Sequence, residues 1–335
     1  MNTSAVQFDN SNQLKRILYR FSSYIRILQR FISNGVPILE IIKTRFPYYF
    51  SDNPKPCSLS VELGNVCNLK CVYCNVPHYS DQREFMSKSI FEKLIENLKK
   101  ENINRIDIGG GEPTLHPNFI EFMSEVRKYT KFLSIITNAQ WNQPRIVNTL
   151  INTPFDLIEV SMDAGGKEVY ESSRVGASYE LFEENLQNLK ELKEKKHSKA
   201  LIGMRLMLRP STKNLIDKEK IKCNKYCDCI MPQFILKIPE TNYDEDIFIP
   251  IQRQNNSVPK CTLPFKDCML KLNGDIPYCN VTGSTITRKR LIAGNILNDS
   301  IHIIWNTQVK KIRTAHRKRI FSSSETEYCK GCSSY

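Results

Sequence analysis

Residues 58–238 alternate short apolar runs with longer amphipathic segments, and this alternation constrains the fold more than any other feature of the sequence. Strand-length runs separated by helical segments predict a parallel sheet covered by helices, an α/β fold. The expected strands are 58–63, 105–108, 132–136, 157–161, 201–208 and 233–238. The expected helices are 85–100, 118–129, 144–151, 179–195 and 213–227. Six such units are too few for a closed eight-stranded barrel.

Polar motifs follow the expected strands. Gly110-Gly111-Glu112-Pro113 follows the second strand, Thr137-Asn138 the third, and Ser161 and Asp163 end the fourth. In α/β barrels the chemistry lies on the loops after the carboxyl ends of the strands. A glycine run also lets the backbone approach a ligand closely. The sequence therefore predicts a ligand site at this edge of the sheet.

Cys67, Cys71 and Cys74 form a C-x3-C-x2-C motif in the loop after the first expected strand. A tetrahedral zinc site needs four ligands, and no His or Cys follows at zinc-finger spacing. A [4Fe–4S] cluster also has four corners, so three thiolates leave one iron open to a cofactor or a substrate. The motif therefore favours an iron–sulfur cluster over zinc.

A second group of cysteines lies near the C-terminus, as C-x17-C at Cys261 and Cys279 and C-x2-C at Cys329 and Cys332. From the residues alone, these four could close a [4Fe–4S] cluster or a structural zinc site. Residues 270–279 predict a hairpin around an Asn-Gly turn, followed by a turn at 294–295 and a helix over 300–313. The remaining cysteines are expected to be small buried hydrophobic residues: Cys57, Cys223, Cys227, Cys229 and Cys268.

The N-terminal segment predicts a helix from Asn12, followed by a second helix from Pro37 to about Phe46. An apolar stripe at spacings of four and three runs along the first helix: Leu14, Leu18, Phe21, Ile25, Leu28 and Ile32. The first interpretation is a helical hairpin packed on the catalytic domain through this stripe. The alternatives are an interfacial helix on an anionic membrane and a short heptad dimer seam.

The net charge of +13 suggests acidic partners such as phosphorylated substrates or anionic lipid, or else a solvated lysine-rich surface. Nucleic acid is not expected, because the sequence has no signature of a nucleic-acid-binding fold beyond the charge. A signal sequence and a membrane-spanning run are also lacking, so a cytoplasmic protein is expected. Twelve cysteines in that compartment indicate metal ligands rather than disulfides.

The cysteine motif, with Tyr73 before its last cysteine, and the Gly-Gly-Glu-Pro loop after a strand resemble the radical S-adenosylmethionine (radical SAM) superfamily. The C-terminal cysteine quartet resembles the SPASM/twitch domain, which carries auxiliary iron–sulfur clusters. The resemblance covers residues 57–335 and implies a partial (β/α)6 TIM-like barrel. It divides the chain into an N-terminal helical extension (1–56), a barrel (57–240) and a small Cys-rich twitch/SPASM domain (241–335).

The resemblance also implies a role for each motif. Cys67, Cys71 and Cys74 would hold the [4Fe–4S] cluster that binds SAM, and Cys261, Cys279, Cys329 and Cys332 one auxiliary [4Fe–4S] cluster. Tyr73 would lie beside the adenine, and Gly110, Gly111, Glu112 and Pro113 would hold the SAM ammonium group. Thr137, Asn138, Ser161 and Asp163 would contact its ribose or carboxylate. Arg205 would pair with the SAM carboxylate inside the barrel, because a charge within an apolar strand needs a partner. Arg174 could serve the substrate, the same carboxylate or a surface salt bridge.

The implied activity is reductive cleavage of SAM to a 5′-deoxyadenosyl radical, which removes a hydrogen atom from the substrate. We expect dehydrogenation or epimerisation of a small sugar-like alcohol, phosphorylated or nucleotide-linked, with Cys268 as the hydrogen-atom donor of an epimerase. A flavodoxin or ferredoxin would be the reductant. The alternatives are a peptide-modifying maturase and, in a different class, a zinc-binding interaction module.

Overall fold

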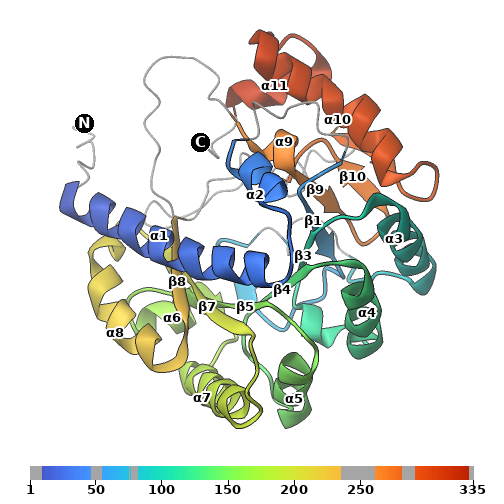
Figure 1. The fold of residues 1–335 in the computed structure, drawn as a ribbon. Coiled ribbons are helices and arrows are strands. Elements are labelled where there is room, and N and C mark those ends of the chain that lie inside the picture. Colours follow the sequence, from blue (N-terminus) through green and yellow to red (C-terminus); the bar gives the residue numbers. More distant parts are fainter. Residues whose placement is uncertain are drawn as a thin grey trace.

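The computed structural model of the chain describes residues 10–46, 55–74, 76, 82–234, 261–280 and 291–331. Its centre is a curved sheet of seven strands in the order β8-β7-β5-β4-β3-β1-β9 (Figure 1). Every neighbouring pair in this sheet is parallel. The strands are β1 (Ser58–Glu62), β3 (Arg105–Gly109), β4 (Phe132–Thr137), β5 (Leu157–Asp163), β7 (Leu201–Leu208), β8 (Cys229–Phe234) and β9 (Asp267–Leu270).

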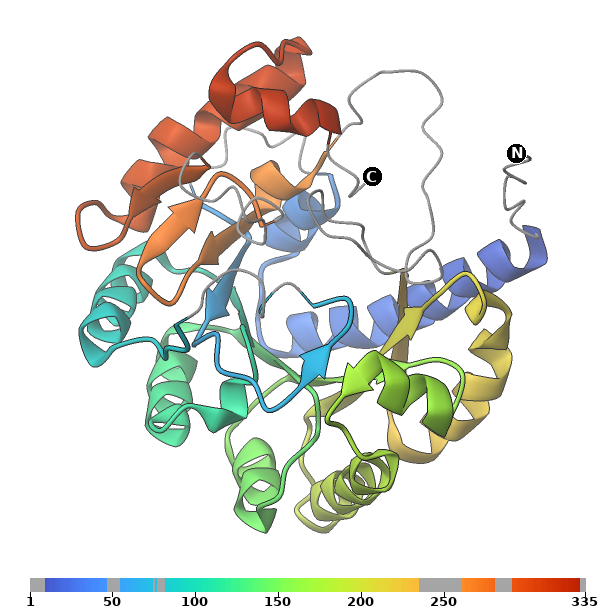
Figure 2. The ribbon, with the colours of Figure 1, turned by 180° about the vertical axis from the view of Figure 1, so that it is seen from behind.

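Helices cover the outer face of this sheet, as in a partial barrel (Figures 1 and 2). They are α3 (Lys88–Glu101), α4 (Phe119–Val126), α5 (Pro144–Asn152), α7 (Tyr179–Lys195) and α8 (Ile216–Tyr226). Short 3₁₀ turns flank them at η3 (Pro113–Leu115), η4 (Arg127–Tyr129) and η5 (Lys213–Leu215). In β3, Ile106 and Ile108 are fully buried, whereas the alternate residues Arg105 and Asp107 face the barrel interior. Period-two patterning thus separates an apolar outer layer from a polar lumen.

The sequence places most of these elements within a few residues, and the α/β prediction is confirmed. The sixth strand starts earlier than predicted: β8 begins four residues before the expected 233–238, of which 235–238 lie outside the described residues. Pro232 explains the difference, because a proline in the sequence argues against a strand at that position. β8 lies at the edge of the sheet, where a residue that lacks an N–H group is tolerated. The expected helix over 213–227 begins as η5 and continues as α8.

The C-terminal residues add β9 to the barrel sheet itself, next to β1. They also form a two-stranded antiparallel sheet of β10 (Asp275–Pro277) and β11 (Ile292–Asn295). The predicted hairpin is partly present. The Asn273-Gly274 turn is formed, with Gly274 at φ +87°, and the N–H of Lys271 donates to the Asp275 carbonyl at 2.8 Å across it. The strand before the turn, β9, pairs with β1 as well. Residues 294–295 belong to β11 rather than to a turn.

Three helices complete this region: α9 (Leu263–Lys266), α10 (Ile301–Lys318) and α11 (Ser324–Gly331). α10 confirms the helix predicted over 300–313 and extends it by five residues. It begins at an N-cap, where the Ser300 hydroxyl accepts a hydrogen bond from the N–H of Ile303.

The N-terminal helix α1 (Asn10–Ser33) crosses the barrel at the starts of the strands (Figure 1). Its Phe31 ring stacks on Phe132, the first residue of β4, with centroids 4.2 Å apart. Phe31 and Ile27 pack with the first residues of β4, β5, β7 and β8: Phe132, Leu157, Leu201 and Cys229. α1 therefore covers the amino-terminal ends of these four strands.

α1 also covers the outer edge of β8. The Ser23 hydroxyl donates to the carbonyl of Ile230 at 2.5 Å and accepts from the N–H of the same residue at 3.1 Å. The Arg20 Nε donates to the carbonyl of Pro232 at 2.8 Å. These contacts occupy backbone groups that an open strand edge would present to another chain.

The predicted packing of the helical extension is wrong in one respect. α1 does pack on the barrel, but it uses the opposite face, and the short helix α2 (Ile38–Arg45) follows it. Leu18, Phe21, Ile25 and Ile32 of the expected stripe are exposed to solvent. None of the described helices is long and apolar enough to cross a membrane.

Candidate functional site

The cysteine loop lies at the carboxyl end of β1, on the side of the barrel opposite to α1 (Figure 2). Part of the loop forms β2 (Lys70–Cys71), which pairs antiparallel with β6 (Arg174–Val175), so that Cys71 lies opposite Arg174. The N–H of Leu69 donates to the Cys67 sulfur at 3.4 Å. The loop is therefore held by backbone contacts that the sequence analysis does not predict.

Burial controls the protonation of these thiols. It raises the pKa of Cys67 to about 11 and that of Cys71 to about 12, and it also raises the pKa of Cys74. The Arg174 guanidinium lowers the pKa of Cys71 and Cys74 and so opposes the effect of burial. Because a thiolate is the form that binds iron, binding of a cluster would release protons here.

The glycine loop contacts the cysteine loop directly. The N–H of Gly111 donates to the Gly64 carbonyl at 2.8 Å. A Cβ added at Gly111 would lie 2.1 Å from the carbonyl oxygen of Val66, and one at Gly110, where φ is +123°, would lie 2.4 Å from that of Gly64. Close approach to the backbone therefore requires glycine at both positions. Contact between this loop and the SAM ammonium group remains a prediction.

Glu112 ties two strand ends together. One carboxylate oxygen accepts from the Thr114 hydroxyl at 2.7 Å and from the Thr137 hydroxyl at 2.8 Å. The other accepts from the backbone N–H of Asn138 at 2.8 Å. Burial raises the pKa of Glu112, and these hydrogen bonds oppose that rise. Pro113 is buried and begins η3, so the loop is fixed immediately after Glu112.

Asn138 links this network to the cysteine loop. Its side-chain amide donates to the Asn68 side-chain oxygen at 2.8 Å and lies 3.8 Å from the Cys67 sulfur. Its own side-chain oxygen accepts from the N–H of Gln140 at 2.8 Å. Thr137 and Asn138 therefore position the cysteine loop, and contact between these two residues and SAM remains a prediction.

Asp163 is fully buried at the end of β5. Its Oδ2 accepts from Arg174 Nε at 2.5 Å and from the Tyr73 hydroxyl at 2.8 Å. Its Oδ1 is buried without a hydrogen-bond partner among the described residues. A buried acceptor left unpaired is costly, so this oxygen is a candidate for a ligand hydroxyl or ammonium group.

Arg174 follows α6 (Lys167–Ser173) and is only 4% exposed, so the surface salt bridge is excluded. Its guanidinium lies over the rings of Tyr73 and Tyr170, 5.7 and 5.6 Å from their centroids. Burial alone would lower the pKa of Arg174, but the acidic groups around it, Tyr73 and Asp163 first, raise it. Tyr73 thus lies within a buried polar cluster beside the cysteines.

Arg205 has a partner on the neighbouring strand. Its guanidinium donates to Glu159 Oε2 from Nε at 2.9 Å and from the terminal nitrogen at 2.6 Å. The charge therefore does not need a SAM carboxylate to be paired, and contact between Arg205 and SAM remains a prediction. Ser161 lies next along the same face of β5 and is partly exposed to the lumen.

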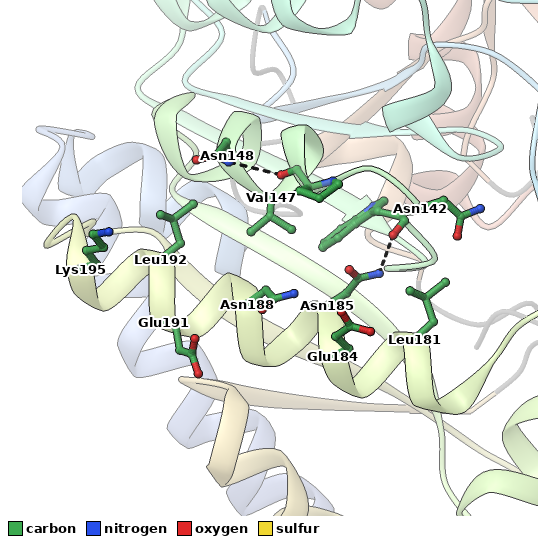
Figure 3. A pocket seen from close by; sticks show the side chains of 12 residues that line it. Asn142, Val147, Asn148, Leu181, Glu184, Asn185, Asn188, Glu191, Leu192 and Lys195 are labelled. Atoms are coloured by element: carbon green, nitrogen blue, oxygen red, sulfur yellow. Dashed lines mark hydrogen bonds between the residues drawn. The ribbon is translucent and has the colours of Figure 1, made fainter.

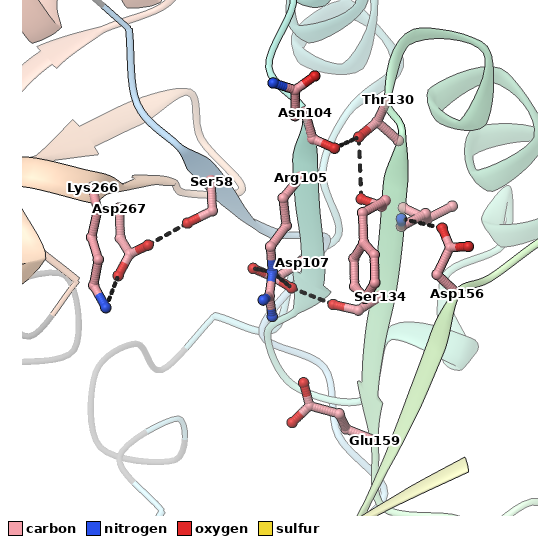
Figure 4. Close-up of polar contacts among 12 residues, drawn as sticks. Ser58, Asn104, Arg105, Asp107, Thr130, Ser134, Asp156, Glu159, Lys266 and Asp267 are labelled. Atoms are coloured by element: carbon pink, nitrogen blue, oxygen red, sulfur yellow. Dashed lines mark hydrogen bonds and ion pairs between the residues drawn. The ribbon is translucent and has the colours of Figure 1, made fainter. Parts of the chain in front are cut away.

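Polar side chains continue from Glu159 toward the amino-terminal end of the barrel, where Arg105, Asp107 and Ser134 lie together (Figure 4). Arg105 contacts Asp107 at 2.8 Å, and Asp107 accepts a hydrogen bond from Ser134. Nearer the site, Lys271 pairs with Glu62 at 2.7 Å, and both side chains are buried. These residues are not among the predicted site residues, although the sequence carries a signal for them. Polar residues alternate with apolar ones in Ser-Leu-Ser-Val-Glu, Arg-Ile-Asp-Ile-Gly and Leu-Ile-Glu-Val-Ser-Met-Asp.

Three of the four auxiliary-cluster candidates lie on the small C-terminal elements. Cys261 precedes α9, Cys279 follows β10 and Cys329 is on α11, and all three are partly buried. Both α9 and α11 pack on α10. Cys332 lies outside the described residues. The structure is thus consistent with a shared ligand set, which remains a prediction.

Cys268 does not fit the role of hydrogen-atom donor. It lies on β9 opposite Leu59, and both are in the apolar core on the helix side of the sheet. Its neighbours on the strand face the lumen instead. Burial raises the pKa of Cys268 to about 12. Cys223 and Cys229 are likewise buried among apolar residues, as expected.

In the described part of the chain, no three His, Cys, Asp or Glu side chains meet closely enough to hold one metal ion. A cubane cluster requires a different arrangement, because each thiolate binds a separate iron. The donor set on the cysteine loop is three thiols beside a cationic guanidinium, with one unpaired carboxylate oxygen nearby. These residues fit a cluster with a cofactor better than a zinc ion, which needs a fourth ligand.

A cavity of about 510 Å³ lies elsewhere, between α5 and α7 on the outside of the barrel (Figure 3). Asn148, Asn188, Glu184 and Glu191 are among the residues that line it. Because it is on the helical layer, away from the cysteine loop, we do not assign it to the site.

Two family models match the chain. Residues 61–206 match that of the radical SAM superfamily, and residues 261–333 match that of SPASM, an iron–sulfur cluster-binding domain. The first match includes the three-cysteine loop, and the second includes all four C-terminal candidate ligands.

Among curated proteins, the mycofactocin maturase MftC of Mycobacterium tuberculosis is 28% identical over 134 residues, 40% of this chain and 34% of that protein. The tungsten-containing aldehyde ferredoxin oxidoreductase cofactor-modifying protein of Pyrococcus furiosus is 34% identical over 107 residues, 31% of this chain and 30% of that protein. The matched region spans about a third of the length of these relatives.

Solved structures share the fold. AnSMEcpe with bound AdoMet has a TM-score of 0.56 at 18% identity and covers 82% of this chain and 85% of that one. SuiB of Streptococcus suis bound to the precursor peptide SuiA has a TM-score of 0.55 at 13% identity and covers 78% of this chain and 67% of that one. BtrN in complex with AdoMet and 2-DOIA has a TM-score of 0.52 at 19% identity and covers 82% of this chain and 92% of that one.

Proposed function

Because the chain belongs to the radical SAM superfamily and ends in a SPASM domain, we propose that it is a radical enzyme that modifies a peptide. The two domains imply a [4Fe–4S] cluster that binds SAM and auxiliary iron–sulfur binding. When bound, SAM and its cluster supply a radical that removes a hydrogen atom from the substrate. The observation that carries the proposal is the joining of the three-cysteine loop to the polar ends of β3, β4 and β5.

We assign Cys67, Cys71 and Cys74 to the SAM cluster and the unpaired oxygen of Asp163 to a hydroxyl or ammonium group of SAM. The Arg174 guanidinium supports both, because it pairs with Asp163 and opposes the negative charge of the thiolates. The network of Glu112 and Asn138 positions this loop. These residues bind and orient, and the lumen below them receives the substrate.

The peptide substrate is supported by the maturases among the relatives, including MftC. The lumen agrees with a polar substrate, because paired acidic and basic side chains line it, Glu159 with Arg205 among them. A sugar-like alcohol, the first expectation from the sequence, has no support among the curated relatives named above. We therefore place the maturase first and retain dehydrogenation or epimerisation of a sugar-like alcohol as the competing reaction.

The test is anaerobic reconstitution, followed by incubation with SAM, dithionite and short peptides encoded beside the gene. We expect 5′-deoxyadenosine together with a mass change in one peptide, and neither with Cys71→Ala. Cys329→Ala should retain some SAM cleavage while losing the peptide product. SAM cleavage coupled only to oxidation or epimerisation of a sugar-like alcohol would refute the peptide substrate. A colourless zinc protein without SAM cleavage would refute the enzyme itself.

A further inference from the structure

The outward faces of α1 and α2 form an exposed apolar surface. We define this N-terminal patch as Leu18, Phe21, Ile25 and Ile32 of α1 together with Ile38, Leu39, Ile42 and Phe46. Phe21 is 61% exposed and Ile38 is 67% exposed. Large apolar side chains gathered in one short segment indicate an interaction site rather than ordinary surface composition.

Part of the patch lies on α1, and the opposite face of this helix is fixed to the barrel by hydrogen bonds and an ion pair. Arg30 pairs with the buried Asp156 at 2.8 Å, and Asn34 donates to the same carboxylate at 2.7 Å. Ser23 bonds both backbone groups of Ile230 on the other side. Rotation of α1 to bury its apolar face would break all these contacts. The exposed face is therefore a stable feature of the fold.

The segment that carries the patch is basic. Residues 10–46 contain seven Lys or Arg residues and one acidic residue, Glu40, which bonds Lys43 at 2.9 Å. Two of the seven, Arg20 and Arg30, bond the barrel instead of facing solvent beside the patch. Arg26 is exposed on α1, beside the apolar face. The lysine-rich helix α8 lies next to α1, and its Lys220 is 4.4 Å from the ring centroid of Tyr19. An apolar stripe flanked by cations is the composition of helices that lie in a membrane interface.

We propose that the N-terminal patch docks the protein on the surface of an anionic lipid bilayer. A second copy of the chain is a poorer occupant, because two basic surfaces would face each other. An anionic bilayer suits both the apolar side chains and the cations of the patch. Its acyl region accepts the apolar side chains, and its headgroups attract the cations. In the sequence, Phe46 is followed by Tyr48, Tyr49 and Phe50, and aromatic residues are enriched at such interfaces.

The position of the patch allows this without blocking the site. α1 lies in front of the strand starts in Figure 1, whereas the light-blue cysteine loop is in front in the opposite view of Figure 2. The bilayer would therefore contact the amino-terminal end of the barrel while the cysteine loop faces away. This inference does not depend on the identity of the substrate.

The test is sedimentation of the full-length, cluster-loaded protein with vesicles of phosphatidylcholine, with and without phosphatidylglycerol. We expect binding to the anionic vesicles, weakened by salt and at least ~10-fold lower for Phe21→Ser/Ile25→Ser. Ile120→Ser on α4 is the matched control, because Ile120 is 57% exposed outside the patch, and it should bind as the wild type does. Iron content and SAM cleavage should be unchanged in every variant.

Absence of binding to anionic vesicles, or equal binding by the double variant and the wild type, would overturn the proposal. Light scattering tests the alternative that a second copy of the chain binds the patch. A wild-type dimer that ignores vesicles and that Phe21→Ser/Ile25→Ser converts to a monomer would show a contact between copies instead, and would also overturn it.

Discussion

Replacement of Arg174 by Met tests whether the Asp163–Arg174 pair is the buried centre of the site. The two side chains are 5% and 0% exposed, and their closest atoms are 2.5 Å apart. Arg174→Met would leave the Asp163 carboxylate buried with the Tyr73 hydroxyl as the hydrogen-bond donor that remains. Removal of one partner of a buried ion pair costs about 3–5 kcal/mol, a large part of the ~5–15 kcal/mol by which most proteins are stable.

The assay is urea unfolding of the apoprotein under anaerobic conditions, followed by circular dichroism. A double-mutant cycle with Asp163→Asn separates the pair from its surroundings, and we expect a coupling of about 1–3 kcal/mol. Lys167→Met is the matched control, because Lys167 and Glu180 form an exposed pair whose loss should leave the curve unchanged. The reasoning fails if Arg174→Met behaves like this control, or if the cycle is additive.

Three further predictions concern other parts of the molecule. Gly111→Ala should sharply lower iron incorporation because its Cβ would meet the Val66 carbonyl, whereas Gly109→Ala, with open space around its Cβ, should load normally. Ser23→Ala should cost about 1–3 kcal/mol of unfolding free energy and speed hydrogen exchange at Ile230, and Ser22→Ala on the exposed side should do neither. Burial lowers the pKa of His316 to about 4. Unfolding free energy should therefore fall as the pH drops from 6.5 to 4, by up to about 1.4 kcal/mol per unit, and His316→Phe should flatten this slope relative to the wild type.

The sequence predicts the strands whose apolar residues face the helices, because burial of that face requires a run of apolar residues that can be recognised in the sequence. It fails at β8, where Pro232 is tolerated only because the strand is at an edge. It also fails for α1, because two sets of apolar residues share one helix, and the set that faces the barrel, Tyr19, Ile27 and Phe31, is not the expected stripe. No local pattern distinguishes the set that packs inside from the set that remains outside.

The candidate site divides in the same way. Cysteine spacing identifies Cys67, Cys71 and Cys74 as a group, since ligand spacing is local. The partners of Arg174 and Arg205 cannot be predicted in this manner. Arg174 reaches Asp163 through the unpredicted β2–β6 pairing, and Arg205 finds Glu159 on a neighbouring strand. Such pairings depend on the register between distant segments, which a single sequence does not reveal.

The pairing of β9 with β1 has a consequence for synthesis of the chain. Ser58 bonds Asp267, which is 209 residues further along. At about 5–20 residues per second, a ribosome needs ~10–40 s to make the intervening chain. During that time one edge of β1 has no neighbour, and contacts of such long sequence separation form slowly. The nascent barrel is thus vulnerable to misassociation along β1, and a chaperone that shields this edge would act on it until β9 emerges.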